Sequence, residues 1–206
     1  MDFFKAMQER HACKEFDDTK KIDSNDLNNI LEAGRLSPSS FGLEHWKFLV
    51  IQNEELKAKL RPLCWNQVQI TSSSELIVIL AKTACLKPDN RYIKDMLFRR
   101  DYPQEKKDFY LKLYGDFIQD KLESKALYGW SRAQCYIASA NMMTYASSIG
   151  IDSCPIEGFE KESVEKLLNI DTDEFELALI LPFGYRKNPA SDKKRLPLDK
   201  VVEFIK

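Results

Sequence analysis

Hydrophobic residues recur along this chain at two spacings, one typical of helices and one typical of buried strands. Helical spacing predicts a short helix over the first nine residues, a second beginning near Ser24, and others over residues 54–60, 63–72, 103–125, 129–148 and 162–168. Short apolar runs predict strands over residues 46–52, 76–81 and 175–185, the second of them fully buried. Pro182 in the last run predicts an edge strand or a strand end.

Together these elements predict an α+β fold, in which a small mixed β-sheet is covered by helices. No repeat or Pro/Gly/Ser-rich linker divides the 206 residues, so we expect a single domain over residues 1–206. The segment 129–148 is rich in small residues, which is typical of a central, closely packed helix, and we expect Gly150 to end it. Near the C-terminus the chain has an apolar stripe with no obvious internal partner, so we expect it to pack on another subunit: Val201, Val202, Phe204 and Ile205.

Composition argues against several classes of protein. A formal net charge of −1 provides no overall basic field for nucleic acid or an anionic membrane. No run approaches the roughly 18 to 20 apolar residues that span a bilayer, and the first residues lack the pattern of a signal peptide. Five scattered cysteines and only two histidines, His11 and His45, disfavour a disulfide scaffold and a metal site. We therefore expect a cytoplasmic protein that binds no metal, nucleic acid or membrane.

Two short basic clusters are candidates for anion binding: Arg10-His11-Ala12-Cys13-Lys14 and Lys193-Lys194-Arg195. Arginine and lysine together can clamp a phosphate, arginine through paired hydrogen bonds and lysine as a point charge. The alternative is that both clusters are ordinary solvated surface charge.

The loop from Gly150 to Phe159 contains Pro155 and Gly158 and can present backbone N–H groups to a ligand, because Gly158 has no Cβ. The loop from Ser37 to Gly42 offers hydroxyls and amides, although serine-rich turns are usually only turns. Three amide side chains can either read a polar ring edge or face solvent: Asn66, Gln67 and Gln69.

Side-chain machinery for hydrolysis or group transfer is missing from the sequence. It has no phosphate loop, no dinucleotide turn and no nucleophile elbow, and Cys154 is best interpreted as a packing residue. Exposed amides and cation clusters suit instead a bound organic cofactor that performs the chemistry itself.

Five segments, in order, resemble those of the FMN-dependent nitroreductases, specifically the oxygen-insensitive, NAD(P)H-dependent bacterial branch. They span nearly the whole chain: residues 9–17 (Glu-Arg-His-Ala-Cys-Lys-Glu-Phe-Asp), 36–46 (Leu-Ser-Pro-Ser-Ser-Phe-Gly-Leu-Glu-His-Trp), 66–69 (Asn-Gln-Val-Gln), 152–159 (Asp-Ser-Cys-Pro-Ile-Glu-Gly-Phe) and 193–197 (Lys-Lys-Arg-Leu-Pro). The resemblance implies a nitroreductase-like fold.

The resemblance also implies which residues bind FMN: Arg10, His11, Ala12, Lys14, Pro38, Ser39, Ser40, Gly42, Asn66, Gln69, Pro155, Ile156, Glu157, Gly158, Lys193 and Arg195. Cations of the two clusters would hold the phosphate. Lys14 would be the catalytic residue, placed at the N1/O2 edge of the ring, where a cation stabilises the charge of the reduced flavin. Asn66 and the amides of Glu157 and Gly158 would face the N5 side.

A homodimer with FMN at the subunit interface is implied as well. The loop 37–42 would come from the second subunit, and the C-terminal tails would be exchanged between sheets. The implied reaction is ping-pong: NAD(P)H gives a hydride to N5 and leaves, and then a nitroaromatic or quinone acceptor is reduced. Phe117 or Tyr114 would form the aromatic lid over the substrate, with a role in the core as the alternative.

Three departures from the family pattern leave the nicotinamide preference and the acceptor open. Ala12 replaces a frequent serine, residues 42–45 (Gly-Leu-Glu-His) stand where Asn-x-Gln-Pro is usual, and Gln69 stands where lysine can occur. The alternatives are a flavoprotein of this fold with another task, such as reductive dehalogenation or flavin degradation, and a non-catalytic flavin-binding dimer.

Overall fold

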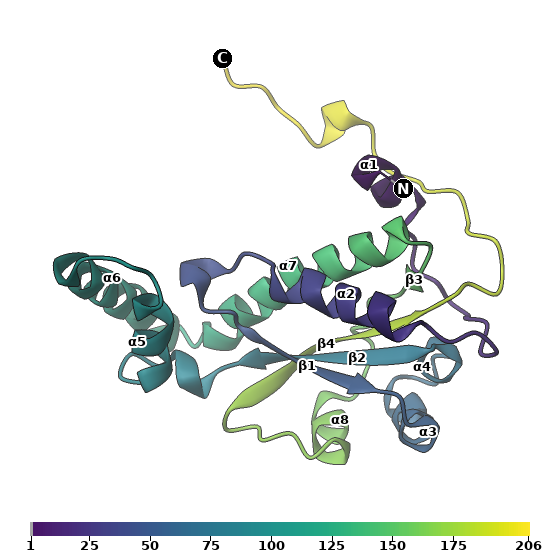
Figure 1. The fold of residues 1–206 in the computed structure, drawn as a ribbon, viewed down its shortest axis with the longest axis horizontal. Coiled ribbons are helices and arrows are strands. Elements are labelled where there is room, and N and C mark those ends of the chain that lie inside the picture. The colour runs from purple at the N-terminus through teal and green to yellow at the C-terminus, as the bar shows by residue number, and fades with distance from the viewer. Residues whose placement is uncertain (1) are drawn as a thin grey trace.

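A four-stranded β-sheet forms the centre of the molecule (Figure 1). The computed structural model describes residues 2–206, and its strands lie in the order β1 (Trp46–Ile51), β2 (Glu75–Lys82), β4 (Phe175–Gly184) and β3 (Asp152–Ser153). All three strand pairs are antiparallel, and one isolated parallel bridge joins Ala12 to Ser153. The predicted α+β class with a small sheet covered by helices is confirmed, but the four strands are all antiparallel, so the expectation of a mixed sheet is wrong.

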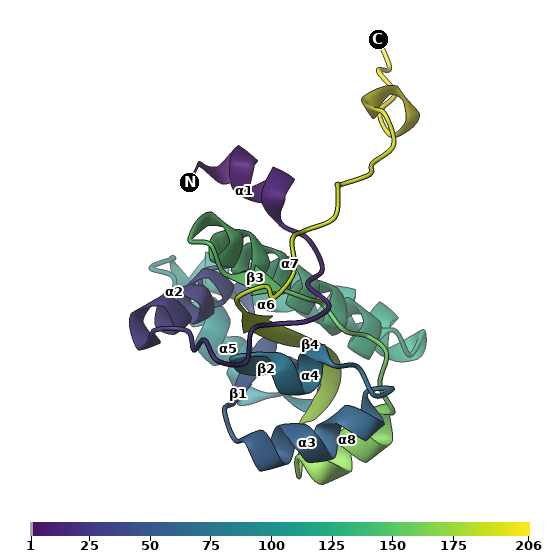
Figure 2. The ribbon, with the colours of Figure 1, turned by 90° about the vertical axis from the view of Figure 1, so that its right-hand side faces the viewer.

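Helices cover both faces of this sheet (Figure 2). One face packs against α2 (Ser24–Arg35) and α7 (Leu127–Ser148), and the other against α3 (Glu54–Leu63), α4 (Gln69–Ser72) and α8 (Lys161–Leu167). In β2, Ile77 and Ile79 belong to the first core and Leu76 and Val78 to the second. A strand whose alternate side chains enter two cores reads as a continuous apolar run, which is why β2 was predictable.

The long helix α7 packs closely, as its small residues predict. A Cβ added to Gly34 on α2 would lie 2.7 Å from the Met142 sulfur, so the two helices touch at this glycine. Just beyond the end of α7, Gly150 has a φ of 82°, which is the left-handed conformation expected of a glycine that follows a helix.

The remaining helices lie outside this sandwich. At one end of the sheet, α5 (Arg91–Phe98) and α6 (Gln104–Glu123) form a third core cluster, and at the other end α1 (Phe3–Glu9) sits on α7 (Figures 1 and 2). The chain places α6 where a helix was predicted over residues 103–125, whereas α5 and β3 have no counterpart among the predicted elements.

The single helix predicted over residues 63–72 is wrong. The helix α3 ends at Leu63, and then Trp65 and Asn66 adopt positive φ angles of 53° and 56°. This left-handed backbone breaks the helix, so the chain turns and becomes helical again only at Gln69. Asn66 and Gln69 therefore lie on a turn and a short helix instead of one helix face.

Two smaller expectations also need correction. Asp23, and not Ser24, caps α2, since its carboxylate accepts a hydrogen bond from the Asn25 N–H at 2.8 Å. Pro182 lies near the end of β4, which is flanked by β2 and β3, so the strand end is confirmed and the edge position is wrong.

The C-terminal tail runs away from the body of the molecule past α1, with one short turn of 3-10 helix at Leu198–Lys200 (Figures 1 and 2). Its apolar side chains are exposed, Phe204 to 80% and Ile205 to 93%. The body of the chain thus leaves the predicted apolar stripe uncovered. Separately, none of the helices within residues 2–206 is both long and apolar enough to cross a membrane.

A buried lysine ties α3 to the entrance of β2. The Lys57 ammonium donates hydrogen bonds of 2.8 Å to the carbonyls of Ser73 and Ser74 and lies 3.3 Å from a Glu54 carboxylate oxygen. We expect Lys57→Met to lower the free energy of unfolding by about 2–4 kcal/mol, because two carbonyls lose a charged donor. Urea denaturation measures this change. Lys59→Met, at an exposed position of the same helix, is the control, and equal stability of both variants would contradict the expectation.

Candidate functional site

The N-terminal segment lies directly against the loop that follows α7. Ala12 forms the parallel bridge with Ser153, and the Cys13 N–H donates to the Ser153 carbonyl at 3.0 Å. This pairing carries the exposed Lys14 to the loop, where its Nζ lies 3.7 Å from the Cys154 sulfur. Two segments that are far apart in sequence, both predicted to bind one ligand, are therefore brought together.

Gln67 from the turn before α4 and Gln69 at the start of α4 hold the same loop. The Gln69 amide donates to Gln67 Oε1 at 3.0 Å, and the Gln67 amide donates to the Gly158 carbonyl at 2.9 Å. A Cβ on Gly158 would lie 2.6 Å from the Trp65 ring, so the close approach predicted at this glycine is made by the indole. Gln69 is buried, whereas Asn66 is exposed. The side-chain amide of Asn66 makes no hydrogen bond within residues 2–206, although its backbone groups bond to Arg61.

Free backbone donors occur at one point of this loop. Ile156 exchanges two hydrogen bonds with Ile180, of 2.9 and 3.1 Å, and so uses its own N–H in the sheet. In the part of the chain that the structure describes, the next two N–H groups, those of Glu157 and Gly158, donate to no acceptor. These are the two amides that the resemblance assigns to the flavin.

The Glu157 carboxylate is already engaged by side chains of α7. Tyr136 donates its hydroxyl to one carboxylate oxygen, and the Arg132 guanidinium lies 3.2 Å from the other. Arg132 is itself fixed by a 3.2 Å hydrogen bond to the Ala178 carbonyl. Burial, followed by the bond to Glu157, raises the pKa of Tyr136. Sequence reasoning missed Arg132 and Tyr136, because the contact joins residues more than twenty positions apart.

The two basic clusters meet beside this loop. The Lys193 ammonium donates to the Met7 carbonyl, and partial burial together with the charges of Arg10 and Arg195 lowers the pKa of Lys193. Arg10 and Arg195 therefore each lie close enough to Lys193 to repel its charge, and a group of like charges of this kind favours a bound anion. Lys14 belongs to the same group, since Lys14 and Arg10 both act on the Cys154 thiol.

His11 points toward a carboxylate at the edge of this region. Its Nδ1 lies 3.5 Å from Asp152 Oδ1, and the other Asp152 oxygen accepts from Arg186 Nε at 2.9 Å. Burial lowers the pKa of His11 despite the opposing effect of Asp152. The contact is close but is not a hydrogen bond, because His11 Nδ1 is buried without a hydrogen-bond partner among the described residues.

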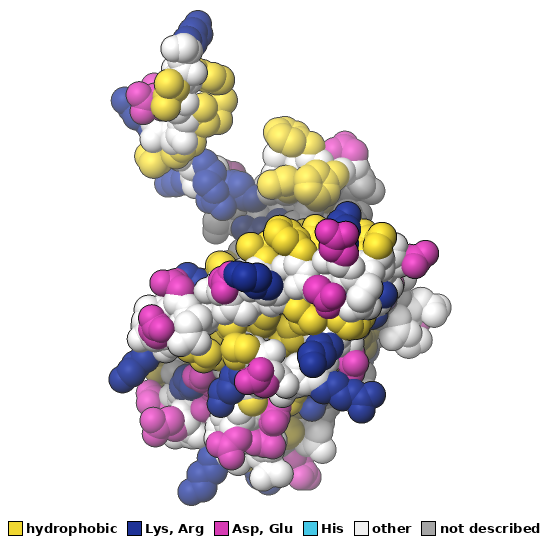
Figure 3. All heavy atoms as spheres, turned by 90° about the vertical axis from the view of Figure 1, so that its left-hand side faces the viewer, with side chains coloured by type: hydrophobic (Ala, Val, Ile, Leu, Met, Phe, Trp, Pro, Cys, Tyr) yellow, Lys and Arg dark blue, Asp and Glu magenta, His cyan; other side chains and the backbone are white. Residues whose placement is uncertain are grey.

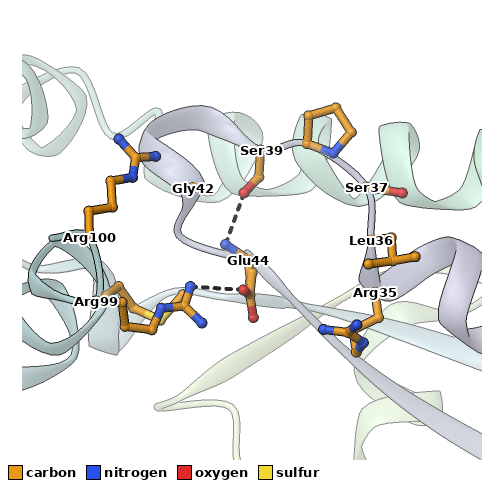
Figure 4. A pocket seen from close by; sticks show the side chains of 10 residues that line it. Arg35, Leu36, Ser37, Ser39, Gly42, Glu44, Arg99 and Arg100 are labelled. Atoms are coloured by element: carbon orange, nitrogen blue, oxygen red, sulfur yellow. Dashed lines mark hydrogen bonds and ion pairs between the residues drawn. The ribbon is translucent and has the colours of Figure 1, made fainter.

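A second group of predicted residues lines a separate cavity of about 450 Å³ (Figure 4). Pro38, Ser39 and Gly42 form one wall, and Arg35, Glu44, Met96, Arg99 and Arg100 contribute to the rest. The turn is held from within, because the Ser39 hydroxyl accepts the Glu44 N–H at 2.9 Å. It is also held by α7, because the Ser40 N–H donates to Gln134 at 3.0 Å.

The two groups contact different parts of α7. The serine turn bonds to Asn141 through Ser37 and to Gln134 through Ser40, whereas Ser147, near the end of the helix, donates to the Ala6 carbonyl just before the N-terminal cluster. About 20 Å of helix separates Gln134 from Ser147 at 1.5 Å per residue, and Figure 1 shows the tip of the turn and α1 toward the two ends of α7. A single chain therefore does not bring Pro38, Ser39, Ser40 and Gly42 to Lys14.

The two lid candidates differ in their surroundings. Tyr114 is 1% exposed and donates its hydroxyl to the Leu86 carbonyl, so the alternative of a role in the core is confirmed for Tyr114. Phe117 is half-buried and packs against Phe41 at 5.3 Å and Trp130 at 5.2 Å between ring centroids. Phe117 accordingly accompanies the serine turn and not the loop beside Lys14.

Comparison with known proteins decides the family. A sequence model of the Nitroreductase family matches residues 7–185. The chain belongs to the nitroreductase family. Proteins of Staphylococcus haemolyticus and Bacillus subtilis that bear the provisional name NAD(P)H nitroreductase are each 41% identical to it, over 97% and 95% of this chain and 95% and 94% of theirs. A solved structure from Exiguobacterium sibiricum, provisionally a nitroreductase in complex with FMN, has a TM-score of 0.83 and 27% identity, covering 100% of this chain and 98% of that one.

Membership in the nitroreductase family confirms the resemblance drawn from the five segments, and with it the nitroreductase-like fold. The family pattern does not cover the arginines of the second cavity. Arg99 and Arg100 lie at the end of α5, a helix that the hydrophobic pattern did not predict, and the departure at Gly42 is the one sequence signal that points toward them.

His45 gives this nitroreductase a measurable pH response. Its Nε2 lies 3.3 Å from the Ser40 carbonyl, its Nδ1 is buried without a partner, and burial lowers its pKa to about 4. The unfolded chain, with a histidine pKa of 6.5, takes up this proton first as the pH falls. Stability from a neutral His45 is therefore complete above pH 6.5 and is lost between pH 6.5 and 4, by about 3 kcal/mol.

We expect His45→Phe to lose less free energy of unfolding than the wild type over that interval, as measured by urea denaturation at each pH. Subtracting one profile of unfolding free energy against pH from the other removes the contribution of the carboxylates, because it is the same in both proteins. Parallel profiles for wild type and variant would show that His45 is not buried in its neutral form.

Proposed function

We propose that this nitroreductase-family protein is an FMN-dependent oxidoreductase that uses NAD(P)H to reduce nitroaromatic or quinone acceptors. Residues 1–206 would act as one FMN-binding domain of a cytoplasmic homodimer. The observation that carries the proposal is the pair of free N–H groups at Glu157 and Gly158, in the loop that Lys14 contacts. Three clustered basic side chains that can bind a phosphate accompany them: Arg10, Lys193 and Arg195. The names of the relatives and the FMN complex of the similar structure support it.

The residues at the loop fit FMN at both of its ends. Arg10, Lys193 and Arg195 supply the charges that a phosphate monoester needs. The backbone N–H groups of Glu157 and Gly158 and the side-chain amide of Asn66 are donors of the kind that a flavin ring edge accepts. Bound FMN would supply the redox chemistry, taking a hydride from NAD(P)H and passing the electrons to the acceptor.

The chain itself would orient and stabilise the cofactor. The Lys14 ammonium would hold the flavin ring at its charged edge and would stabilise the negative charge of the reduced cofactor. Glu157 acts through its N–H, because its carboxylate is held by Arg132 and Tyr136 and is not free to move a proton. Burial raises the pKa of Cys154, so this thiol stays protonated at neutral pH and serves as packing.

A homodimer follows from the separation of the two groups. A twofold axis would place the serine turn and Phe117 of one subunit against Lys14 of the other, so that each site takes one part from each chain. Exposed apolar side chains on α1 and the tail suit such an interface (Figure 3): Phe3, Phe4, Met7, Leu196, Leu198, Val201, Phe204 and Ile205. The five unpaired cysteines suit a reducing cytoplasm.

Anaerobic titration of the FMN-loaded protein tests the proposal. We expect NADH or NADPH to bleach the yellow flavin absorbance, and nitrofurazone or menadione to restore it. In Lys14→Met we expect weaker FMN binding and flavin reduction about 10- to 100-fold slower, because a cation that stabilises the reduced ring is lost. Lys20→Met, which removes an exposed lysine paired with Asp17, is the matched control.

Protein that stays colourless after FMN is added would overturn the whole proposal. Yellow protein that neither NADH nor NADPH bleaches would favour the non-catalytic flavin-binding dimer. A Lys14→Met variant with normal melting temperature and full activity would remove Lys14 from the mechanism.

Removal of residues 197–206 tests the role of the tail while it leaves Lys193 and Arg195 in place. We expect the full chain to sediment as a dimer of the 24.0 kDa subunit, and the truncated chain to have a higher dimer dissociation constant, because apolar contact area is lost. Analytical ultracentrifugation measures both. An unchanged dissociation constant would show that the tail does not bridge the subunits.

A further inference from the structure

Three arginines line the second cavity, and they differ in their partners (Figure 4). Arg35 makes two hydrogen bonds of 2.6 Å to the Glu32 carboxylate, and Arg99 makes one of 2.8 Å to Glu44. Arg100 makes no ion pair or side-chain hydrogen bond with any residue from 2 to 206. The two neutralised arginines leave Arg100 as the one uncompensated cation among the described residues of the cavity wall.

The backbone beside Arg100 is shaped to admit its guanidinium. Gly42 has a φ of 68°, and a Cβ placed there would lie 3.0 Å from Arg100 Nη2. The same turn carries a second donor, because the Ser39 oxygen accepts the Glu44 N–H and its own proton stays free for a ligand. A charged fork and a hydroxyl therefore face one cavity, which is a donor set suited to a phosphate or another oxyanion.

We propose that Arg100, beside the serine turn, forms a binding subsite for a phosphate group of the reduced nicotinamide dinucleotide. The inference rests on the function proposed above and extends it to the donor substrate. The Glu44 carboxylate in the same wall does not oppose an anion strongly, since Arg99 neutralises it.

The dinucleotide, and not the flavin, is the source of this phosphate for a geometric reason. FMN has one phosphate, and the cluster of Arg10, Lys193 and Arg195 at the other end of α7 is provided for it. A nicotinamide dinucleotide carries two or three phosphates beyond the ring that must reach the flavin. In the proposed dimer the serine turn of one subunit borders the flavin of the other, so the cavity at that turn lies along the path of the donor. Its volume of about 450 Å³ is within the range of ligand pockets.

The test compares Arg100→Gln with wild type in the reductive half-reaction of the FMN-loaded protein. We expect the apparent Kd for NADPH or NADH to rise about five- to tenfold, the effect of one exposed charge-assisted contact, with an unchanged limiting rate of flavin reduction. Dihydronicotinamide riboside, which has no phosphate, should reduce both proteins equally. Calorimetry with NADP⁺, which does not react, should give the same fold-change in Kd, and higher salt should narrow the difference.

Two further variants serve as controls. Arg100→Lys keeps the charge and should restore most of the affinity. Arg91→Gln removes an exposed arginine from α5, the helix that precedes Arg100. Arg91 pairs with Asp95 and does not line the cavity, so this variant should leave every constant unchanged.

An unchanged Kd for both dinucleotides in Arg100→Gln would overturn the subsite, and so would an equal loss of affinity for dihydronicotinamide riboside. Weakened FMN binding with unchanged dinucleotide binding would overturn it as well, by assigning the anion site to the flavin. Failure of the function itself is distinguishable, because wild-type protein would then not be reduced by any of the three donors.

Discussion

The pairing of residues 152–156 along β4 is the interaction on which the candidate site depends. Asp152 and Ser153 pair with the last residues of β4, Cys154 donates to the Pro182 carbonyl, and Ile156 exchanges two bonds with Ile180. This one edge fixes three parts of the site. The Ser153 carbonyl receives the N-terminal segment with Lys14, the Cys154 sulfur lies against Lys14 and Gln69, and the chain leaves the sheet directly after Ile156. Because the ladder ends there, the next two N–H groups have no partner, so free donors arise from the point where the sheet stops.

The length of helix α7 determines the distance between the two groups of predicted site residues. Its small residues let it lie against the sheet and against Gly34 of α2, and its length keeps the serine turn apart from the N-terminal cluster. A closely packed helix of this length does not bend to bring its ends together. The separation of the two groups in a single chain is thus a consequence of the core, and in the proposed dimer a second copy would supply the missing half without any change of fold.

The sequence predicts an element best when a single local pattern, such as hydrophobic periodicity, determines its structure. The buried run of β2 was predictable, because periodicity reports burial directly. The position of α6 was predicted as well, but Phe109 and Leu113 of its apparent apolar face are exposed. The turn at Trp65 and Asn66 was not, because its left-handed residues are stabilised by the packing of Trp65 on Gly158, a contact between distant segments. The order of short motifs predicted which residues would belong to the site. It did not indicate that Glu157 is held by Arg132 and Tyr136, since no periodicity relates α7 to that loop.

The departure from the family pattern at residues 42–45 changes which distant side chains this turn contacts, namely Arg99 and Arg100. Glycine at position 42 loses a side chain that could have bonded a ligand, yet it opens the space in which the Arg100 guanidinium lies. Glu44 in the same stretch draws Arg99 to itself and leaves Arg100 without a counter-ion. His45 replaces a rigid proline with a neutral ring that packs on Trp130 and contacts the Ser40 carbonyl, so the turn is held by side-chain contacts instead of by a fixed φ. Gly42 and Glu44 thus change the wall of the cavity directly, whereas the buried His45 acts from behind it by holding the turn that carries them.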